Sequence, residues 1–359
     1  GQARTTASRG IDMPRPSYQS YEDFVRIAFA YFVGLANPAH PNAGRSARAL
    51  YRRYSSYHPD PLIAPKVPLA GDPLYTALSN LINNIGNHVV RVQSDDWNLL
   101  DNAAVRQEYQ SRLGGQLNPL SRSALATQSS YLHVYPTGTV ATAPDSVTLP
   151  AGRPGAAPIG GGGGPDLPRN NWRIGINVEP SSMAAAVAAL VGIMDNNADI
   201  NHIKFAAPGT AGKPDSVIIY LRKSDNTYAG IRDAVEAAVA GLNIQHKFSP
   251  MWNEIANGFA EAAEPPKGGS SFGGYRCNLA VLAYLELLAA GVNVTINNYL
   301  AYMQRTFSIF GIPVQLPHRQ GPLDDPLYDN QMRRRFMQVL ALKKRRAANR
   351  YQNRQLINR

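Results

Sequence analysis

The feature that most constrains the fold is an alternation of strand-like and helix-like segments between residues 172 and 242. Short apolar runs bounded by turn residues predict strands, and longer segments with apolar residues three and four apart predict helices. The predicted strands are WRIGINV (172–178), NHIKFA (201–206) and SVIIYLR (216–222), and the predicted helices span 181–195 and 228–242. Because a sheet buries its apolar face against a second layer, this order predicts an α+β fold in which helices flank a small sheet.

The flanking segments extend the pattern on both sides. Helical spacing predicts that the first 115 residues are mainly helical, with helices over 21–35 and 43–54 and around 74–85 and 97–113. Strand-like alternation follows over 130–135 and 138–149. Toward the C-terminus, helices are predicted near 250–263, 276–291 and 296–308.

These segments divide the chain into five consecutive parts. Residues 1–20 are polar and rich in small side chains, so we expect a disordered arm. Residues 21–150 form the helical region with the first strands, and residues 170–315 form the α+β core. The Gly/Pro-rich stretch 151–169 cannot hold regular structure and is either a linker or a long surface loop. Residues 316–359 are predicted to be a basic tail with a helix.

The net charge of +11 is concentrated in that tail. From Gln331 onward there are ten Lys or Arg and no acid, which leaves 26 basic against 25 acidic residues in the rest of the chain. A basic helix over 333–354 with one apolar side is typical of segments that contact nucleic acid or an acidic membrane surface. The alternative is a solubilising terminal helix that packs through its apolar side.

The sequence also excludes several common classes of protein. Cys277 is the only cysteine, which rules out internal disulfides and cysteine-based metal clusters. No apolar run reaches the roughly eighteen residues of a membrane-spanning helix, so no transmembrane segment is expected. The start of the chain lacks the apolar core of a secretory signal peptide. The glycine run 160–164 lacks nucleotide-loop spacing, and HExxH and GxSxG are absent, so neither a metal nor a cofactor is expected.

Basic side chains in and beside the central strands predict an anion site. Residues two apart in a strand share a face, so His202 and Lys204 point the same way, as do Tyr220 and Arg222 on the next strand. Lys213 lies near the turn between these strands. Arg276 follows the Ser- and Gly-rich start of a predicted helix in SSFGGYRC (270–277), which is a natural anion-binding arrangement.

A doubly charged anion such as phosphate suits these groups. The alternative is structural: Lys204 guards an edge strand, Arg222 is a solvated strand end, and the Ser/Gly stretch merely caps its helix.

Several motifs occur in an order that resembles the HopA family of bacterial type III effectors and its enzyme relatives in lanthipeptide biosynthesis. They are YFVGLANP, RALYRRYSSYHPDP, WRIGINVEPSSMAAAVAALVGIMD, INHIKFAAPG, KPDSVIIYL and GGSSFGGYRCNLA, and the resemblance covers about residues 24–292. The family is similar in fold to phosphothreonine lyases. The resemblance implies a carbon–oxygen lyase that removes phosphate from phosphoserine or phosphothreonine by β-elimination, without metal or cofactor.

The resemblance also implies roles for individual residues. Lys204 corresponds to the base, which must be neutral to take the α-proton. Asn177 stands near the position where phosphothreonine lyases have a histidine acid, and His202 is a candidate substitute. The implied phosphate and substrate contacts are Lys213, Arg276, Tyr220, Arg173 and Arg222. Lys213 stands where such lyases have an arginine, so it keeps the charge and loses the bidentate geometry.

Three biological roles are compatible with this resemblance. As a virulence effector, the protein would leave the bacterial cytoplasm with a secretion chaperone, enter the host cell and act on phosphorylated signalling proteins. As a biosynthetic lyase, it would work with a kinase to dehydrate a ribosomal peptide. As a non-catalytic protein, it would bind phosphorylated partners without cleaving them.

Overall fold

The computed structural model describes residues 17–38, 43–55, 90–94, 129–136, 140–143, 146–148, 171–206, 214–224, 226–245, 248–256, 258–265 and 271–321, together with Arg334. The predicted helices at 74–85 and 97–113, the Gly/Pro-rich stretch 151–169 and Lys213 lie outside the described residues. So do most of the arm and, Arg334 apart, the tail beyond residue 321.

Among the described residues, seven strands form one sheet in the order β1-β2-β6-β7-β5-β9-β8, and every neighbouring pair is antiparallel. The strands are β1 (Val90–Ser94), β2 (Ser129–Val134), β5 (Trp172–Ile176), β6 (Ile200–Ala206), β7 (Val217–Leu221), β8 (Asn253–Ala256) and β9 (Phe259–Ala263). A separate hairpin pairs β3 (Val140–Ala143) with β4 (Ser146–Thr148).

The helices that frame this sheet agree with most of the sequence predictions. They are α1 (Ser17–Val33), α2 (Ala43–Ser55), α7 (Met183–Asp195), α8 (Tyr228–Val239), α9 (Phe272–Ala289) and α10 (Ile296–Ile309), with a short 3-10 turn η1 (Pro180–Ser182) before α7. Side chains cap two of them: the Ser271 hydroxyl accepts from the Gly274 N–H and the Thr295 hydroxyl from the Asn298 N–H. The α+β prediction is confirmed.

The predicted helix near 250–263 is wrong. This segment is the β8–β9 hairpin, in which β9 pairs along β5 from Phe259 opposite Ile176 to Ala263 opposite Trp172. Its alanines favour a helix locally, and the backbone bonds offered by β5 override that preference. Gly258 allows the tight connection, because its φ of +67° is costly for residues with a Cβ.

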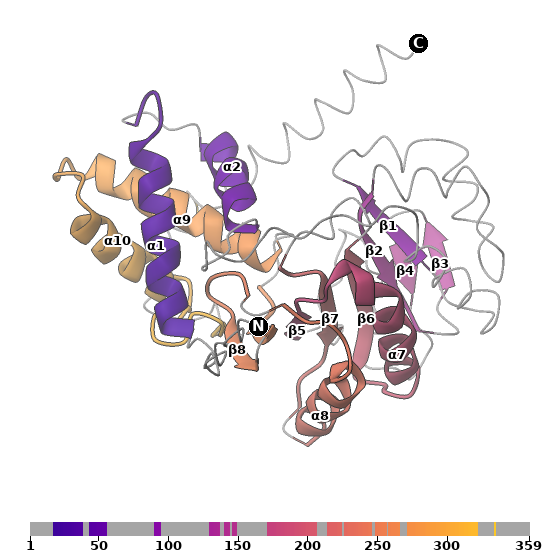
Figure 1. The fold of residues 1–359 in the computed structure, drawn as a ribbon. Helices are drawn as coiled ribbons and strands as arrows, with labels where there is room; N and C mark the ends of the chain where they lie inside the picture. Colours follow the sequence, from indigo (N-terminus) through magenta and orange to yellow (C-terminus); the bar gives the residue numbers. More distant parts are fainter. Residues whose placement is uncertain are drawn as a thin grey trace, which may run out of the picture.

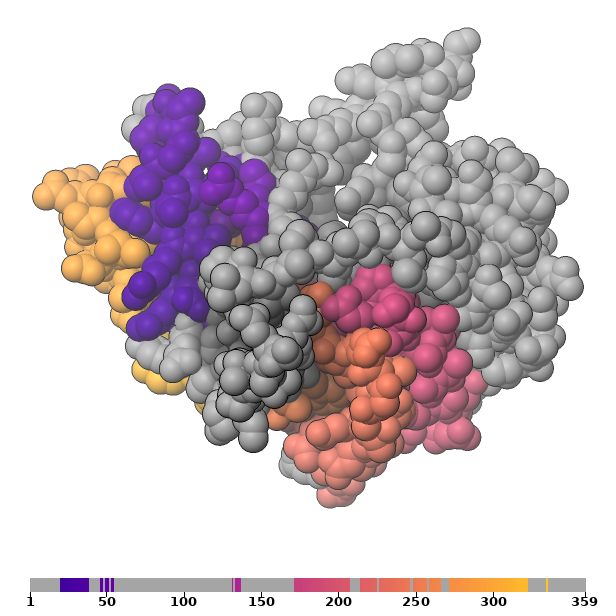
Figure 2. Space-filling view, viewed as in Figure 1, coloured from indigo at the N-terminus to yellow at the C-terminus, as the bar shows by residue number. Residues whose placement is uncertain are grey.

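One face of the sheet is covered by α7 and α8. Its core contains aliphatic and aromatic side chains from the central strands, including Ile174, Ile203, Phe205 and Ile219, packed with Leu190 of α7. Figure 1 shows both helices on this side of β6 and β7. In the space-filling view, α8 (orange) lies beside α7 (magenta), whereas α1 (indigo) lies with α10 (yellow) on the other side of the molecule (Figure 2).

The other face meets, at its β5–β9 end, a helical layer made of α1, α2, α9 and α10 (Figure 1). Its core joins Ala260 and Ala262 of β9 to residues of all four helices. Helix α2 approaches the start of α9 very closely, because a Cβ at Gly273 would lie 2.2 Å from Cε1 of Tyr54. Glycine at this position therefore brings the N-terminus of α9 against α2. No helix in the described part of the chain has the length and apolar character needed to cross a membrane.

Candidate functional site

The strands bring four of the eight predicted site residues onto one face of the sheet. His202 on β6 pairs with Tyr220 on β7, and Tyr220 pairs with Arg173 on β5, so these three side chains form a row. Lys204 lies one step along β6 and pairs with His133 on β2. We call these five residues the polar face. Arg173 lies 5.6 Å from the Phe272 ring of α9, so the polar face looks toward the helical layer.

The polar face is buried even though it carries charge. Only 3% of Arg173 and 5% of Lys204 is exposed, in line with the burial of every residue of β5 and β6, whereas His133 and Tyr220 are partly exposed. Burying a charged group is costly unless it is paired or hydrogen-bonded. The contacts of each charged side chain therefore indicate what it can do chemically.

The His202 imidazole is held within a stack of rings. Its centroid lies 4.2 Å from that of Tyr220, with an angle of 11° between the planes, and 4.9 Å and 5.2 Å from those of Tyr135 and His133. One ring nitrogen, Nδ1, lies 2.9 Å from Oδ1 of Asn201. These contacts fix the orientation of the ring beside the row that leads to Arg173.

Lys204 contacts a tyrosine that the sequence analysis did not identify. Its Nζ lies 3.6 Å from the ring centroid of Tyr131 on β2, and the Tyr131 hydroxyl donates to Oδ1 of Asp215 at 3.0 Å. The resulting chain runs from Asp215 through Tyr131 to Lys204. The KPDS motif could have indicated Asp215 as a site residue from the sequence. Tyr131 could not be identified in this way, because only the β2–β6 pairing brings it to Lys204.

Phenol groups surround this face in their neutral form. Burial raises the pKa of four tyrosines above the ordinary value: Tyr51, Tyr54, Tyr131 and Tyr220. At neutral pH they are therefore hydrogen-bond donors and not anions. The Arg173 charge acts in the opposite direction on the Tyr220 pKa, and burial outweighs it.

Arg173 is already matched by a carboxylate. Its Nε donates to Oε1 of Glu264 at 2.7 Å, and its Nη2 contacts Oε2 of the same residue. The guanidinium also lies 5.2 Å from the Tyr220 ring centroid. Burial acts to lower the pKa of Arg173, and the charge and hydrogen bond of Glu264 together with the neighbouring tyrosines more than offset it. Arg173 is therefore held in one position on the polar face, with its charge neutralised by Glu264.

Arg276 is held differently. This side chain in the first turns of α9 is fully buried, and its Nη2 donates to the backbone oxygens of Pro317 and Arg319 at 3.1 Å and 3.2 Å. Within the described residues, its Nε and Nη1 have no hydrogen-bond partner and its charge has no carboxylate in contact. Burial lowers the pKa of Arg276 to about 10, so the group remains a cation at neutral pH.

Arg276 and Arg173 pack against the same ring. The guanidinium carbons lie 4.0 Å and 5.6 Å from the Phe272 ring centroid. An unmatched buried guanidinium with free donors is the arrangement that binds phosphate or carboxylate oxygens. Arg276 is thus the strongest anion-binding candidate in the described part of the chain.

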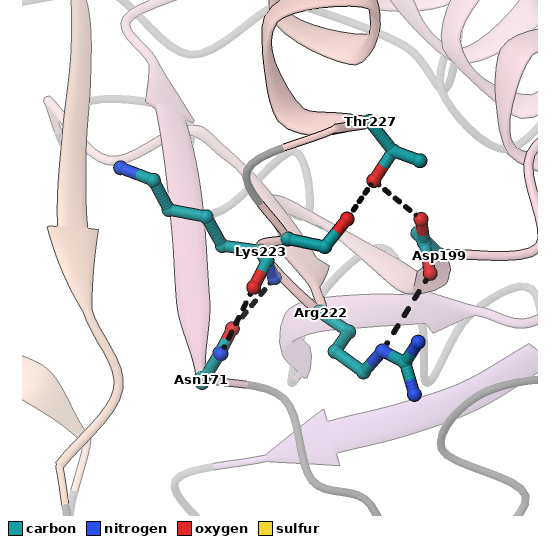
Figure 3. Close-up of polar contacts among 6 residues, drawn as sticks. Asn171, Asp199, Arg222, Lys223 and Thr227 are labelled. Atoms are coloured by element: carbon teal, nitrogen blue, oxygen red, sulfur yellow. Dashed lines mark hydrogen bonds and ion pairs between the residues drawn. The ribbon is translucent and has the colours of Figure 1, made fainter.

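Two further predicted residues follow the ends of strands. Asn177 follows β5 and is fully buried, and its backbone N–H donates to the Gly258 oxygen at 2.7 Å. Arg222 comes after β7 has ended at Leu221, with 43% of its side chain exposed, and its Nε lies 3.7 Å from Oδ1 of Asp199 (Figure 3). The expected sharing of a face by Tyr220 and Arg222 is lost because the strand stops between them.

The described residues offer no group of three or more His, Cys, Asp or Glu side chains that could hold a metal ion. The side chains gathered at and beside the polar face are Lys204, the stacked rings, the neutral phenols and the two arginines.

Two solved structures share this fold. The effector protein from Pseudomonas syringae pv. tomato strain DC3000 aligns with a TM-score of 0.57 at 15% identity, covering 85% of this chain and 99% of that one. The effector protein from Pseudomonas syringae pv. syringae strain 61 gives 0.54 at 15% identity, covering 86% and 99%. No protein-family model matches the chain, and no curated protein does. The fold is therefore of the kind found in bacterial effector proteins.

Proposed function

We propose that the protein binds phosphorylated serine or threonine side chains at the polar face and removes the phosphate by β-elimination. The observation that carries this proposal is the buried Arg276, whose Nε and Nη1 remain without partners among the described residues, on the side of the sheet that also bears Lys204. A buried cation of this kind needs an anion, and the Lys204 amine on the same side of the sheet supplies a base.

The proposed step balances without a co-reactant. The unprotonated Lys204 amine takes the α-proton of the phosphorylated residue, and that electron pair forms the Cα–Cβ double bond. The Cβ–O bond breaks, and phosphate leaves with its electron pair toward Arg276. The products are inorganic phosphate and a dehydroalanine or dehydrobutyrine residue.

The remaining groups have supporting roles in this mechanism. Tyr131, held by Asp215, positions Lys204 through the contact with its ring. Tyr220 is a neutral phenol that can donate to the oxygen on which charge develops as the α-proton leaves. The His202 imidazole is the candidate acid for the leaving phosphate. Lys213 is a further phosphate contact in this proposal and lies outside the described residues.

The biological role that we propose is that of a type III effector, delivered into a host cell where it removes phosphate from signalling proteins. The likeness to two effector structures supports this role over that of a biosynthetic lyase.

A second candidate function is phosphoprotein binding without turnover. It is favoured by the Arg173–Glu264 pair, because an arginine whose charge is neutralised by a carboxylate contributes little to holding a leaving phosphate. Under this alternative, phosphopeptide binds and its mass does not change.

The test is incubation with phosphothreonine and phosphoserine peptides, followed by peptide mass and free phosphate. We expect the mass to fall by one phosphoric acid in the wild type, with the activity lost in Lys204→Met. The Met variant should keep its free energy of unfolding within about 1 kcal/mol, because methionine fills a similar volume and removes a buried polar group.

Arg222→Met is the matched control, since it removes a cation from the end of the neighbouring strand without touching the polar face, and it should retain full activity. Loss of metaphosphate, which signals hydrolysis, would contradict the elimination mechanism. Full activity of Lys204→Met would remove Lys204 as the base.

A further inference from the structure

The opposite face of the sheet carries an arrangement that binds a cation, whereas the polar face is a candidate anion site. It lies at the edge formed by β5, β9 and α8. The Trp172 and Tyr228 rings lie nearly perpendicular, at 78° with centroids 6.2 Å apart. The ammonium of Lys223 lies 3.8 Å from the Trp172 centroid and 4.3 Å from the Tyr228 centroid. One ammonium therefore contacts two aromatic rings, which is the geometry of an aromatic cage for organic cations.

A single carboxylate orients both rings. Oε2 of Glu261 accepts from Trp172 Nε1 at 3.1 Å and also from the Tyr228 hydroxyl, while Oε1 accepts from Asn253 Nδ2 at 3.0 Å. Burial acts to raise the pKa of Glu261, but the hydrogen bonds from Tyr228, Asn253 and Trp172 and the Lys223 charge together outweigh it, and the pKa lies below its ordinary value. Glu261 is therefore an anion at neutral pH, and it adds charge attraction to the ring contacts.

The imidazole of His318 lies beside the Trp172 ring of the cage and does not repel a cation, because it is neutral. It lies edge-on to Trp172, with centroids 6.2 Å apart and an angle of 86°. Burial lowers the pKa of His318 to about 4, so the ring is neutral at neutral pH.

The backbone of Lys223 is held in place by hydrogen bonds that do not involve its side chain. The Lys223 N–H donates to Asn171 Oδ1 at 2.6 Å, and Asn171 Nδ2 donates to the Lys223 oxygen at 3.2 Å. Figure 3 shows the side chain extending away from these two bonds. The side chain can consequently leave the cage by rotating about its own bonds while the strand end stays in place.

We propose that Trp172, Tyr228 and Glu261 form a binding site for an alkylammonium group of a protein partner, with the lysine side chain as the prototype ligand. Lys223 occupies the site as an internal competitor, which such a group displaces. The occupant seen in the structure is itself a lysine, so the cage fits this class of cation in length and charge. The site lies on the α7–α8 face and does not depend on the polar face or its chemistry.

The experiment titrates the full chain with Nα-acetyl-Nε-trimethyllysine methylamide and with the matching lysine compound, followed by calorimetry. We expect Lys223→Ala to bind both at least about tenfold more tightly than the wild type does, because the competitor is gone. An isostere with a neutral tert-butyl group should not bind.

Arg232→Ala is the matched control, because it removes a cation from the neighbouring surface of α8 without opening the cage, and its affinity should equal that of the wild type. The double variant Lys223→Ala/Trp172→Leu, checked for retained fold by circular dichroism, should lose the gain. Equal affinity of the wild type and Lys223→Ala would overturn the proposal, as would equal binding of the tert-butyl isostere.

Discussion

The two faces of the sheet bury different kinds of side chain on their central strands. Toward α7 and α8, the central strands present side chains such as Ile203 and Ile219, which are fully buried and apolar. Toward α2 and α9, the same strands present Arg173, His202 and Lys204, which are nearly as buried and carry polar or charged groups. Alternation along each strand separates the two sets.

The two faces therefore stabilise the fold in different ways. Apolar burial contributes roughly 25 cal/mol for each Å² removed from water, so the α7–α8 face stabilises the protein without further partners. The polar face stabilises it only as far as each charge finds a partner, as Arg173 finds Glu264. The proposed phosphate site would give these buried groups a function.

The largest expected effect comes from breaking the ion pair on the polar face. Glu264→Leu leaves the Arg173 charge buried and unmatched, so we expect a loss of about 3–5 kcal/mol in the free energy of unfolding. Urea denaturation measures it. The double variant Arg173→Met/Glu264→Leu should recover most of the loss, because no isolated charge remains. A double variant as unstable as the single one would show that packing, and not charge, dominates at this position.

A truncation on the apolar face should cost nearly as much and leave the chemistry intact. Ile219→Ala removes a fully buried side chain, for which we expect a loss of about 2–5 kcal/mol. Phosphopeptide turnover, measured well below the new melting temperature, should stay at the wild-type level. A large fall in turnover would mean that the two faces are coupled and that the comparison fails.

A smaller effect should appear with pH at the edge where the faces meet. The pKa of His318 is about 4 in the folded protein and about 6.5 in an unfolded chain, so the unfolded state binds more protons between these values. The stability from the neutral ring is fully present above pH 6.5 and is lost as the pH falls toward 4.

The slope from His318 should be at most about 1.4 kcal/mol per pH unit. Denaturation curves of the wild type and His318→Gln, recorded between pH 4 and pH 6.5, give the His318 contribution as the difference between their free energies of unfolding. Parallel pH profiles would show that His318 does not carry the effect.

Much of the fold could be predicted from the sequence because its signals are local. Helix α7 starts after Pro180 and Ser181 and has apolar residues at helical spacing, and α9 starts at a Ser/Gly cap. The β8–β9 hairpin was missed because FAEAA (259–263) has no strand preference of its own and depends on pairing with β5.

The candidate site was predictable only in part, for the same reason. Spacing within β6 correctly placed His202 and Lys204 on one face, whereas Tyr131 and Glu264 reach the site from strands and loops far away in the chain. Alternation also misplaced Arg222, because nothing local shows that β7 ends one residue earlier and that Asp199 captures the side chain.

The most direct test of the polar face as the phosphate site is a structure of Lys204→Met with a bound phosphothreonine peptide. We predict that phosphate oxygens contact Nε and Nη1 of Arg276 and that the α-hydrogen of the phosphorylated residue faces position 204. A phosphate bound elsewhere, with Arg276 still held only by the Pro317 and Arg319 oxygens, would contradict the account.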